Sequence, residues 1–373
     1  MPDGSSTAHL YRPKLVNLIV EGYSLAAFRA DTIAGLTVAV VALPLSMAIA
    51  VASGVSPDRG IIAAIVGGVL VSALGGSRYQ IGGPAGAFIV LVSATVTAHG
   101  ITGLLLAVLL SGLFLVILGL TRLGSLVRHI PHAVTVGFTF GIAVTIFASQ
   151  LKDLAGLALQ TPEPGPLVPK LQVLATALPT ANISALVLGV ATAIGIFALQ
   201  RWKPAWPNML VAIVIAASAA AAFGLPVETI GSRFGAMSSS LPAPHLPPMD
   251  STLVLAILPS ALSFTLLGAV ESLLSATIAD GMTGRKHRYN MEIVAQGVAN
   301  MVSSLFGGIS VTGTIARTAT NIRAGAKSPM AGILHAVFLL KFMLFAAPLA
   351  SAIPLSALAG MLLAVCWNMT EKK

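Results

Sequence analysis

The sequence predicts an all-α multispan membrane protein built as an inverted seven-helix repeat fold, with the second repeat incomplete. The chain is 56% hydrophobic and only 9% charged, whereas a soluble domain carries about 25% charged residues. Its mean hydropathy is +0.93. Apolar stretches of bilayer length, about 17 to 25 residues, recur along the whole chain. Helix-breaking glycine pairs also recur, about 230 residues apart.

Twelve membrane segments are expected, with ends placed to within about 2 to 4 residues. In chain order they are 32–53, 60–75, 84–98, 101–120, 131–150, 182–200, 207–224, 252–280, 290–306, 312–325, 329–350 and 353–370. Residues 1–30 are expected to form a cytoplasmic N-terminal segment without signal-peptide features, and its residues 15–28 a short interfacial helix. Residues 165–180 are typical of an amphipathic surface helix. Residues 225–250 predict a Pro- and Ser-rich outer loop.

The basic residues predict the orientation of the chain in the membrane. With a cytoplasmic N-terminus, 15 Lys and Arg fall in inner loops and termini and 4 in outer loops, while Arg317 and Lys341 lie within segments. This asymmetry follows the positive-inside rule and supports both the segment count and the orientation. We expect a multi-pass protein of the plasma (inner) membrane. Because the basic residues border a lipid bilayer in short loops, the net charge of +9 does not indicate nucleic acid.

Two similar motifs indicate an internal repeat. "ALGGSRYQIGGP" (73–84) precedes the third segment and "LFGGISVTG" (305–313) precedes the tenth. Segment eight follows segment one, and segment twelve follows segment five, at nearly the same separation in sequence as the two motifs. Seven segments per repeat is an odd number, so the second repeat is inverted, an arrangement typical of secondary transporters. Segments six and seven lack partners, so we expect about two further helices in a complete protein.

The broken helices predict two half-helices, each preceded by a short extended strand, with an anion site between them. A half-helix that starts near the midplane presents N–H groups without intrahelical partners and the positive end of its dipole. In the first motif we expect Gly82 and Gly83 to allow a turn and a close approach of the backbone, and Pro84 to stand in the first helical turn. In the second motif we expect Thr312 to cap the half-helix and Gly313 to allow close approach. A kink or a loop is the alternative for either motif alone, but the pairing favours a site.

Two of the charged residues inside predicted segments refine this prediction, because a charge at membrane depth is expensive. Arg317 is expected about one and a half turns into segment ten as a binding point for the anion, unless it pairs structurally with Glu271 or snorkels. Glu271 is expected near the midplane as a proton carrier, or as a hydrogen-bond partner of the half-helix ends. Pro44 indicates a kink or part of the site, and Phe88 a cavity wall or an apolar contact.

Other chemistry is not indicated. The sequence has no GxxxxGK[ST] motif for ATP, and its histidines lack the Cys or carboxylate partners of a metal site. No membrane-embedded Ser–His pair suggests a protease. The sequence therefore predicts neither an enzyme nor a bound cofactor or metal.

Four ordered motifs resemble the SulP (sulfate permease) family of secondary anion transporters. They are "GLTVAVVALPLSMAIAVASGVSP" (35–57), "GGSRYQIGGPAGAFIVLV" (75–92), "ESLLSATIADGMTGRKHRYNMEIVAQGVAN" (271–300) and "FGGISVTGTIARTATNIRAGAKSP" (306–329). The resemblance implies elevator-type transport, commonly by a homodimer. Carried over by position, the substrate site comprises Ala85, Gly86, Ala87, Phe88, Thr312, Gly313, Thr314 and Arg317. Glu271 matches the acidic residue of helix eight, a position for coupling to H⁺ or Na⁺.

The resemblance also implies a division of the transmembrane domain, residues 31–373. The core would hold about 31–125 and 252–350, and the gate about 126–224 and 351–373. Leu45, Ser310 and Ala316 depart from residues common in the family, and the usual last two helices and STAS domain do not follow. These departures leave the anion open among sulfate, bicarbonate and dicarboxylates. A nucleobase permease of the same fold, an anion channel and a regulatory membrane scaffold remain alternatives.

Overall fold

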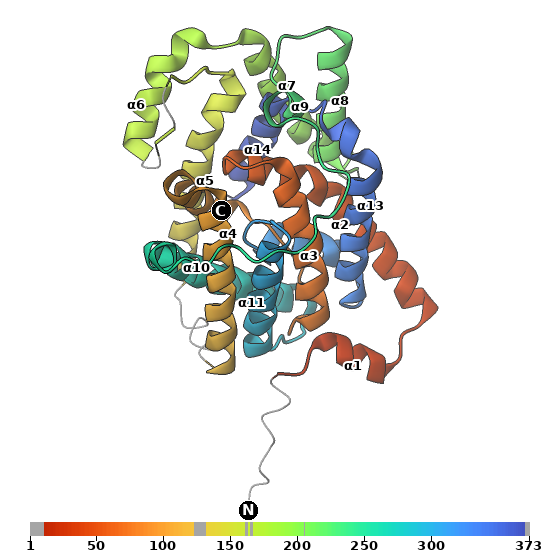
Figure 1. Cartoon of the computed structure of the whole chain (residues 1–373). Coiled ribbons are helices and arrows are strands. Elements are labelled where there is room, and N and C mark those ends of the chain that lie inside the picture. Colours follow the sequence, from red (N-terminus) through yellow and green to blue (C-terminus); the bar gives the residue numbers. More distant parts are fainter. Residues whose placement is uncertain (1–10, 123–131, 161–162, 165–166, 205, 370–373) are drawn as a thin grey trace, which may run out of the picture.

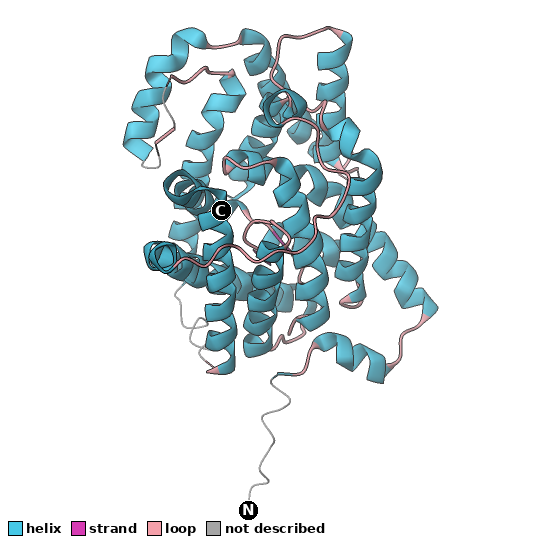
Figure 2. Cartoon of the chain, in the orientation of Figure 1, coloured by secondary structure: helices cyan, strands magenta, loops and turns pink. Residues whose placement is uncertain are grey.

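The computed structural model describes residues 11–122, 132–160, 163–164, 167–204 and 206–369, and helices dominate these ranges (Figures 1 and 2). The longer helices are α2 (Leu25–Ala52), α3 (Pro57–Leu74), α4 (Ile89–Leu120), α5 (His132–Ala155), α7 (Ile183–Trp202), α8 (Asn208–Ala222), α10 (Ser251–Thr283), α11 (Tyr289–Leu305), α13 (Met330–Ala350) and α14 (Leu355–Met369). The shorter ones are α1 (Lys14–Glu21), α6 (Leu167–Ala177), α9 (Ile230–Phe234), α12 (Ile315–Arg323) and the 3₁₀ turns η2 (Gly86–Phe88) and η4 (Leu178–Thr180). Strands β1 (Gly82–Gly83) and β2 (Thr312–Gly313) complete the elements.

Helices long and apolar enough to cross a membrane confirm the predicted multispan class. In the described residues there are six of them: α2, α3, η2 with α4, α7, α10 and α13. Two shorter apolar helices, α8 and α14, add to these. The predicted segments 84–98 and 101–120 form one continuous ribbon, but Gly100 interrupts it with φ 66° and ψ −174°. The two segments are therefore separate helices joined at a glycine.

The structure corrects several of the predicted boundaries. The interfacial helix expected over 15–28 ends at Glu21, because Gly22 takes a φ of 83°, and α2 then begins at Leu25 with the Ser24 hydroxyl accepting from the Ala27 N–H. The loop expected over 225–250 contains α9, which a Thr229–Ser232 capping box starts. The tenth segment begins at Ile315 rather than 312, since Thr312 and Gly313 lie in a strand.

Small residues allow the helices to pack closely. Helix α4 packs against α10 and α11, α13 against α2 and α3, and α14 against α5 and α7. A Cβ on Gly112 of α4 would stand 2.6 Å from the Gly297 carbonyl oxygen of α11. A Cβ on Gly360 of α14 would stand 2.1 Å from the Gly189 carbonyl oxygen of α7. Glycine contacts of this kind are typical of helix interfaces in membranes.

The two strands form an antiparallel pair in the middle of the molecule, surrounded by helices (Figure 2). Gly82 pairs with Gly313, and Gly83 pairs with Thr312. All four residues are buried. The backbone polar groups of these interrupted segments thus find partners in each other, which non-helical backbone at membrane depth requires.

Candidate anion site

Two helices begin at the crossing of the strands. Extended residues Ala85 and Thr314 precede η2 and α12 respectively. This corrects two expectations. Pro84 lies ahead of the first helical turn and not within it. Thr312 does not cap α12, because it lies in β2, where its hydroxyl faces the Gly268 carbonyl oxygen at 3.4 Å. The predicted half-helices preceded by short extended strands are confirmed.

Glycine is required at this crossing for close approach. A Cβ on Gly313 would stand 1.3 Å from Gln80 Nε2, and one on Gly82 would stand 2.4 Å from the Gly67 carbonyl oxygen. Gly82 and Gly83 do not take positive φ values. The expected close approach is therefore present, whereas the turn expected at these two glycines is not.

The starts of η2 and α12 present backbone N–H groups ahead of the helical hydrogen bonds. The Thr318 N–H is bonded to the Thr314 carbonyl oxygen, so the N–H groups of Ile315, Ala316 and Arg317 precede it. In the same way the Phe88 N–H donates to the Ala85 carbonyl oxygen, and the N–H groups of Gly86 and Ala87 precede it. The positive ends of two helices thus meet at the strand pair.

Arg317 lies in the first turn of α12, not one and a half turns into it, and is only 1% exposed. Its Nη2 atom donates to Ser46 Oγ at 3.0 Å and to the Pro84 carbonyl oxygen at 3.3 Å. Its Nε and Nη1 atoms have no partner among the described residues. Arg317 forms no ion pair with Glu271 and does not snorkel to the surface. The guanidinium therefore joins α12, α2 and the segment before η2, with donors left over.

The other predicted residues lie around this crossing. Ala85 and Ala87 are buried, and the Thr314 N–H and hydroxyl both face the Ile81 carbonyl oxygen. Phe88 stacks on Phe264 of α10, with ring centroids 5.8 Å apart and planes at 6°. This stacking supports the apolar-contact interpretation of Phe88.

Glu271 and Gly86 sit beside the same crossing. A Cβ on Gly86 would contact Ile146 of α5 at 3.1 Å. Glu271 of α10 is partly buried next to Ser272, and no hydrogen bond or ion pair of its side chain is seen among the described residues. Helix α2 continues through Pro44, two residues before the Ser46 that Arg317 binds. No group of three potential metal ligands occurs in the described ranges.

A frame of amides and hydroxyls holds the strands, and sequence reasoning missed it. Gln80 Nε2 donates to the Ser272 carbonyl oxygen at 2.9 Å, and Ser272 Oγ donates to Gln296 Oε1 at 3.2 Å. Asn300 binds both backbone groups of Val311, at 2.8 and 2.9 Å. Gln296 and Asn300 are four residues apart in an apolar segment, so they share one helix face. That spacing was the available signal.

A second pair of hydroxyls joins β1 to the helices beside it. The Ile81 N–H donates to Thr318 Oγ1 at 3.1 Å, and Ser275 Oγ lies 3.3 Å from the same atom. These contacts tie the segment before β1 to both α12 and α10. The starts of the two half-helices are thereby held in one position relative to each other.

Comparison with known proteins assigns this arrangement to a family. The sequence matches the family model described as the sulfate permease family over residues 28–373. The chain belongs to the sulfate permease family. It is 41% identical to the "Putative sulfate transporter YvdB" of Bacillus subtilis, covering 95% of the chain and 67% of that protein. It is 34% identical to the bicarbonate transporter BicA of Picosynechococcus sp., covering 89% and 60%. The chain thus spans roughly two thirds of these relatives.

Solved structures of the family share the fold. The transmembrane domain of a cyanobacterial bicarbonate transporter BicA superposes with a TM-score of 0.86 at 31% identity, covering 93% of this chain and 90% of that one. SLC26A9 superposes with a TM-score of 0.88, covering 98% and 61%, and at 17% identity it shows the fold alone. The family membership and the spans make this chain a multi-pass membrane protein with a role in anion transport rather than catalysis.

Proposed function

We propose that the chain is the translocating part of a secondary transporter that binds one small oxyanion at the strand crossing. The position of Arg317 carries this proposal: a buried guanidinium joins one half-helix to the segment before the other, and two of its nitrogen atoms have no partner in the described part of the chain. Ala85, Gly86, Ala87, Thr312, Gly313 and Thr314 would line the site with backbone groups. Phe88 would close one side through its contact with Phe264.

The charges suit a small anion. Each helix end contributes about half a unit of positive charge, and Arg317 contributes one, so the site offers about +2. This balances a dianion and exceeds the charge of a monoanion. The names of the relatives supply sulfate and bicarbonate as the two anions to test first.

Transport itself would follow an elevator-type motion, in which the half-helices and their anion move against a gate. The boundaries predicted for core and gate remain the proposed division. Glu271, partly buried and without an observed partner in the described chain, is proposed to couple this motion to H⁺ or Na⁺. We further propose a homodimer in the plasma membrane with the N-terminus on the cytoplasmic side, as the basic residues indicate.

Counterflow in proteoliposomes tests the proposed function. The full gene product is reconstituted and loaded with unlabelled sulfate or bicarbonate, and uptake of labelled sulfate or labelled bicarbonate is followed in imposed H⁺ and Na⁺ gradients. A carrier accumulates label transiently when the unlabelled anion is inside. Passive equilibration without counterflow would indicate a channel, and no movement of either anion would contradict the proposal for this pair.

A further inference from the structure

A basic pocket lies away from the strand crossing, at the end of the molecule where α1 is found (Figure 1). It has a volume of about 210 Å³. Helix α1, the segment between α3 and β1, and the connection from α10 to α11 supply its walls. The lining residues are Lys14, Ser77, Arg78, Tyr79, Asp280, Arg285, Lys286 and His287.

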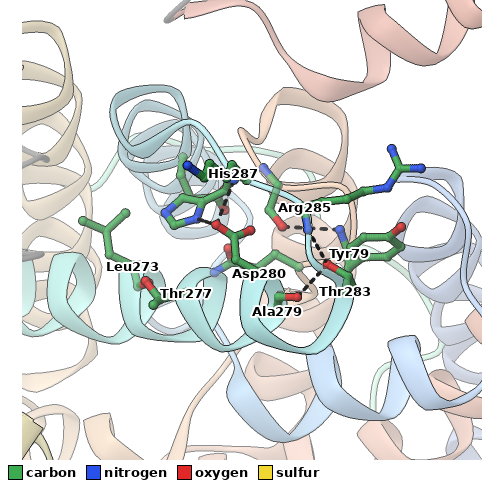
Figure 3. Close-up of polar contacts among 12 residues, drawn as sticks. Tyr79, Leu273, Thr277, Ala279, Asp280, Thr283, Arg285 and His287 are labelled. Carbon is green, nitrogen blue, oxygen red and sulfur yellow. Dashed lines mark hydrogen bonds and ion pairs between the residues drawn. The ribbon is translucent and has the colours of Figure 1, made fainter.

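The pocket carries an excess of positive charge. Four of its residues are Lys or Arg, against the single carboxylate of Asp280. Asp280 is already engaged by His287, whose Nδ1 lies at 2.7 Å and whose N–H donates at 3.0 Å (Figure 3). Burial lowers the pKa of His287 against the opposing effect of Asp280, which disfavours the charged form of the ring. Arg285 and Lys286 are exposed and form no ion pair within the described residues.

The surroundings of Lys14 and Arg78 show the same imbalance. Burial lowers the pKa of Lys14, and the nearby charges of Arg288 and Arg78 lower it further. Arg78 forms an ion pair with Glu21, which is about half exposed, so solvent weakens that compensation. A further anion would therefore relieve repulsion among cations that the fold has already brought together.

Backbone hydrogen bonds make the pocket a preformed structure. The Lys14 N–H donates to the Gly75 carbonyl oxygen at 3.0 Å, and the Arg288 N–H donates to Gly76, also at 3.0 Å. Lys14 Nζ donates to the Lys286 carbonyl oxygen at 2.9 Å. These bonds join the three walls, so little ordering would remain for a ligand to impose.

The pocket lies beside α1, whose apolar side chains are exposed. The exposed fractions of Ile19 and Val20 on α1 are 74% and 72%. An amphipathic helix with such a face lies in the plane of the membrane surface with its apolar side in the headgroup boundary. With α1 placed in this way, the basic pocket would lie at the depth of lipid phosphates.

We propose that this pocket binds a phosphate group, supplied by an anionic lipid headgroup or by a free phosphate. Arg78, Arg285, Lys14 and Lys286 would surround the phosphate oxygens, and Ser77 and Tyr79 are available as hydroxyl partners. The volume is smaller than the roughly 300 Å³ at which sites for drug-sized ligands begin. The pocket thus accommodates a compact charged head and leaves the rest of a ligand outside, toward the membrane face of α1.

The pocket is also linked to the anion site through the chain. Arg78 and Tyr79 line it, and the next residue, Gln80, donates to Ser272 in the frame around the strands. The Tyr79 carbonyl oxygen accepts from Asn321 of α12 at 2.9 Å. A phosphate held by Arg78 would restrain this connection and reduce the local opening of residues 76–83.

Binding to the detergent-purified full gene product tests the proposal. Short-chain phosphatidic acid, short-chain phosphatidylcholine and inorganic phosphate are titrated separately, and hydrogen exchange is followed over 76–83. The test variant is Arg285→Gln with Lys286→Gln, because neither side chain has a structural partner in the described residues. The matched control is Arg201→Gln with Lys203→Gln, two exposed basic residues at the end of α7.

We expect phosphatidic acid to bind the parent and slow exchange over 76–83. The test variant should bind about 30-fold more weakly, the fold-change for two basic residues near an anionic surface, and the control should match the parent. Equal affinity for inorganic phosphate would identify free phosphate as the source, and weaker affinity would identify the lipid. The proposal is overturned if neither phosphate compound binds the parent, if phosphatidylcholine binds equally well, or if test and control variants behave alike.

Discussion

Gly83 of β1 lies directly against the guanidinium of Arg317 in α12. A Cβ on Gly83 would stand 2.1 Å from Nη1 and 3.2 Å from Cζ. The arginine cannot move outward freely, because it is buried and bonded to Ser46 and Pro84. The absence of a side chain at position 83 therefore sets where the buried charge stands relative to both half-helices.

Gly83→Ala is expected to displace Arg317 and reduce transport about 100-fold, since a misplacement of roughly 1 Å at a site has that effect. Overpacking should also lower the free energy of unfolding by about 1–3 kcal/mol. Anion uptake and denaturant titration in detergent measure the two effects. Gly195→Ala in α7 is the control, because a Cβ there meets nothing within 4 Å. Normal uptake by Gly83→Ala would show that the position of Arg317 is not critical.

The sequence was sufficient to predict the spans and the paired breaks, because bilayer-length apolar runs and Gly-Pro signals are local. It placed the start of the second half-helix three residues early. Thr312 has a good capping side chain, but pairing with Gly83 across the strands prevails over that local preference. Such a pairing joins residues 229 positions apart in sequence (312 minus 83), and no local pattern reports it.

The site was predicted only in outline, because some of its signals are local in the sequence and others depend on the fold. Arg317 stands out in the sequence as a charge inside a predicted membrane segment. Its partners Ser46 and Pro84 do not stand out, because only the fold brings α2 and the first break to it. The amide frame of Gln80, Gln296 and Asn300 depends likewise on three separate segments meeting at the strands.

Arg317→Gln is expected to weaken anion binding while the fold remains intact. Removing one partner of a buried charge pair costs roughly 2–5 kcal/mol, which is about 30-fold or more in affinity. Calorimetric titration with sulfate and with bicarbonate measures the loss. Arg323→Gln, at the exposed end of the same helix, is the matched control. If Arg317→Gln binds the anion as tightly as the parent, the arginine is structural.

Gly313→Ala tests the fit between β2 and Gln80. The new Cβ would overlap the Gln80 amide, so we expect a loss of about 1–3 kcal/mol or more in the free energy of unfolding. Gln80→Ala alone should cost about 1–3 kcal/mol, because it removes the bonds to Ser272. The double variant should be less destabilised than the sum by about 0.5–3 kcal/mol, since the second change makes room for the first. Strict additivity would mean that the two residues are not coupled.

Glu271→Gln is expected to act on coupling rather than on binding. The substitution keeps the size of the side chain and removes its titration, and in the described chain it breaks no ion pair. Anion affinity should therefore stay within about threefold of the parent, which corresponds to a difference of less than about 0.7 kcal/mol in binding free energy. Uptake should lose its dependence on pH or on the imposed ion gradient, because a fixed neutral group cannot exchange a proton or attract a cation.

Uptake measured from pH 5 to 8, with and without a Na⁺ gradient, separates the two coupling ions. Glu228→Gln, on an exposed residue paired with Arg233, controls for a general change of charge. A Glu271→Gln protein whose uptake keeps the parent's pH profile and Na⁺ dependence would remove Glu271 from the coupling mechanism and leave it as a structural residue of α10.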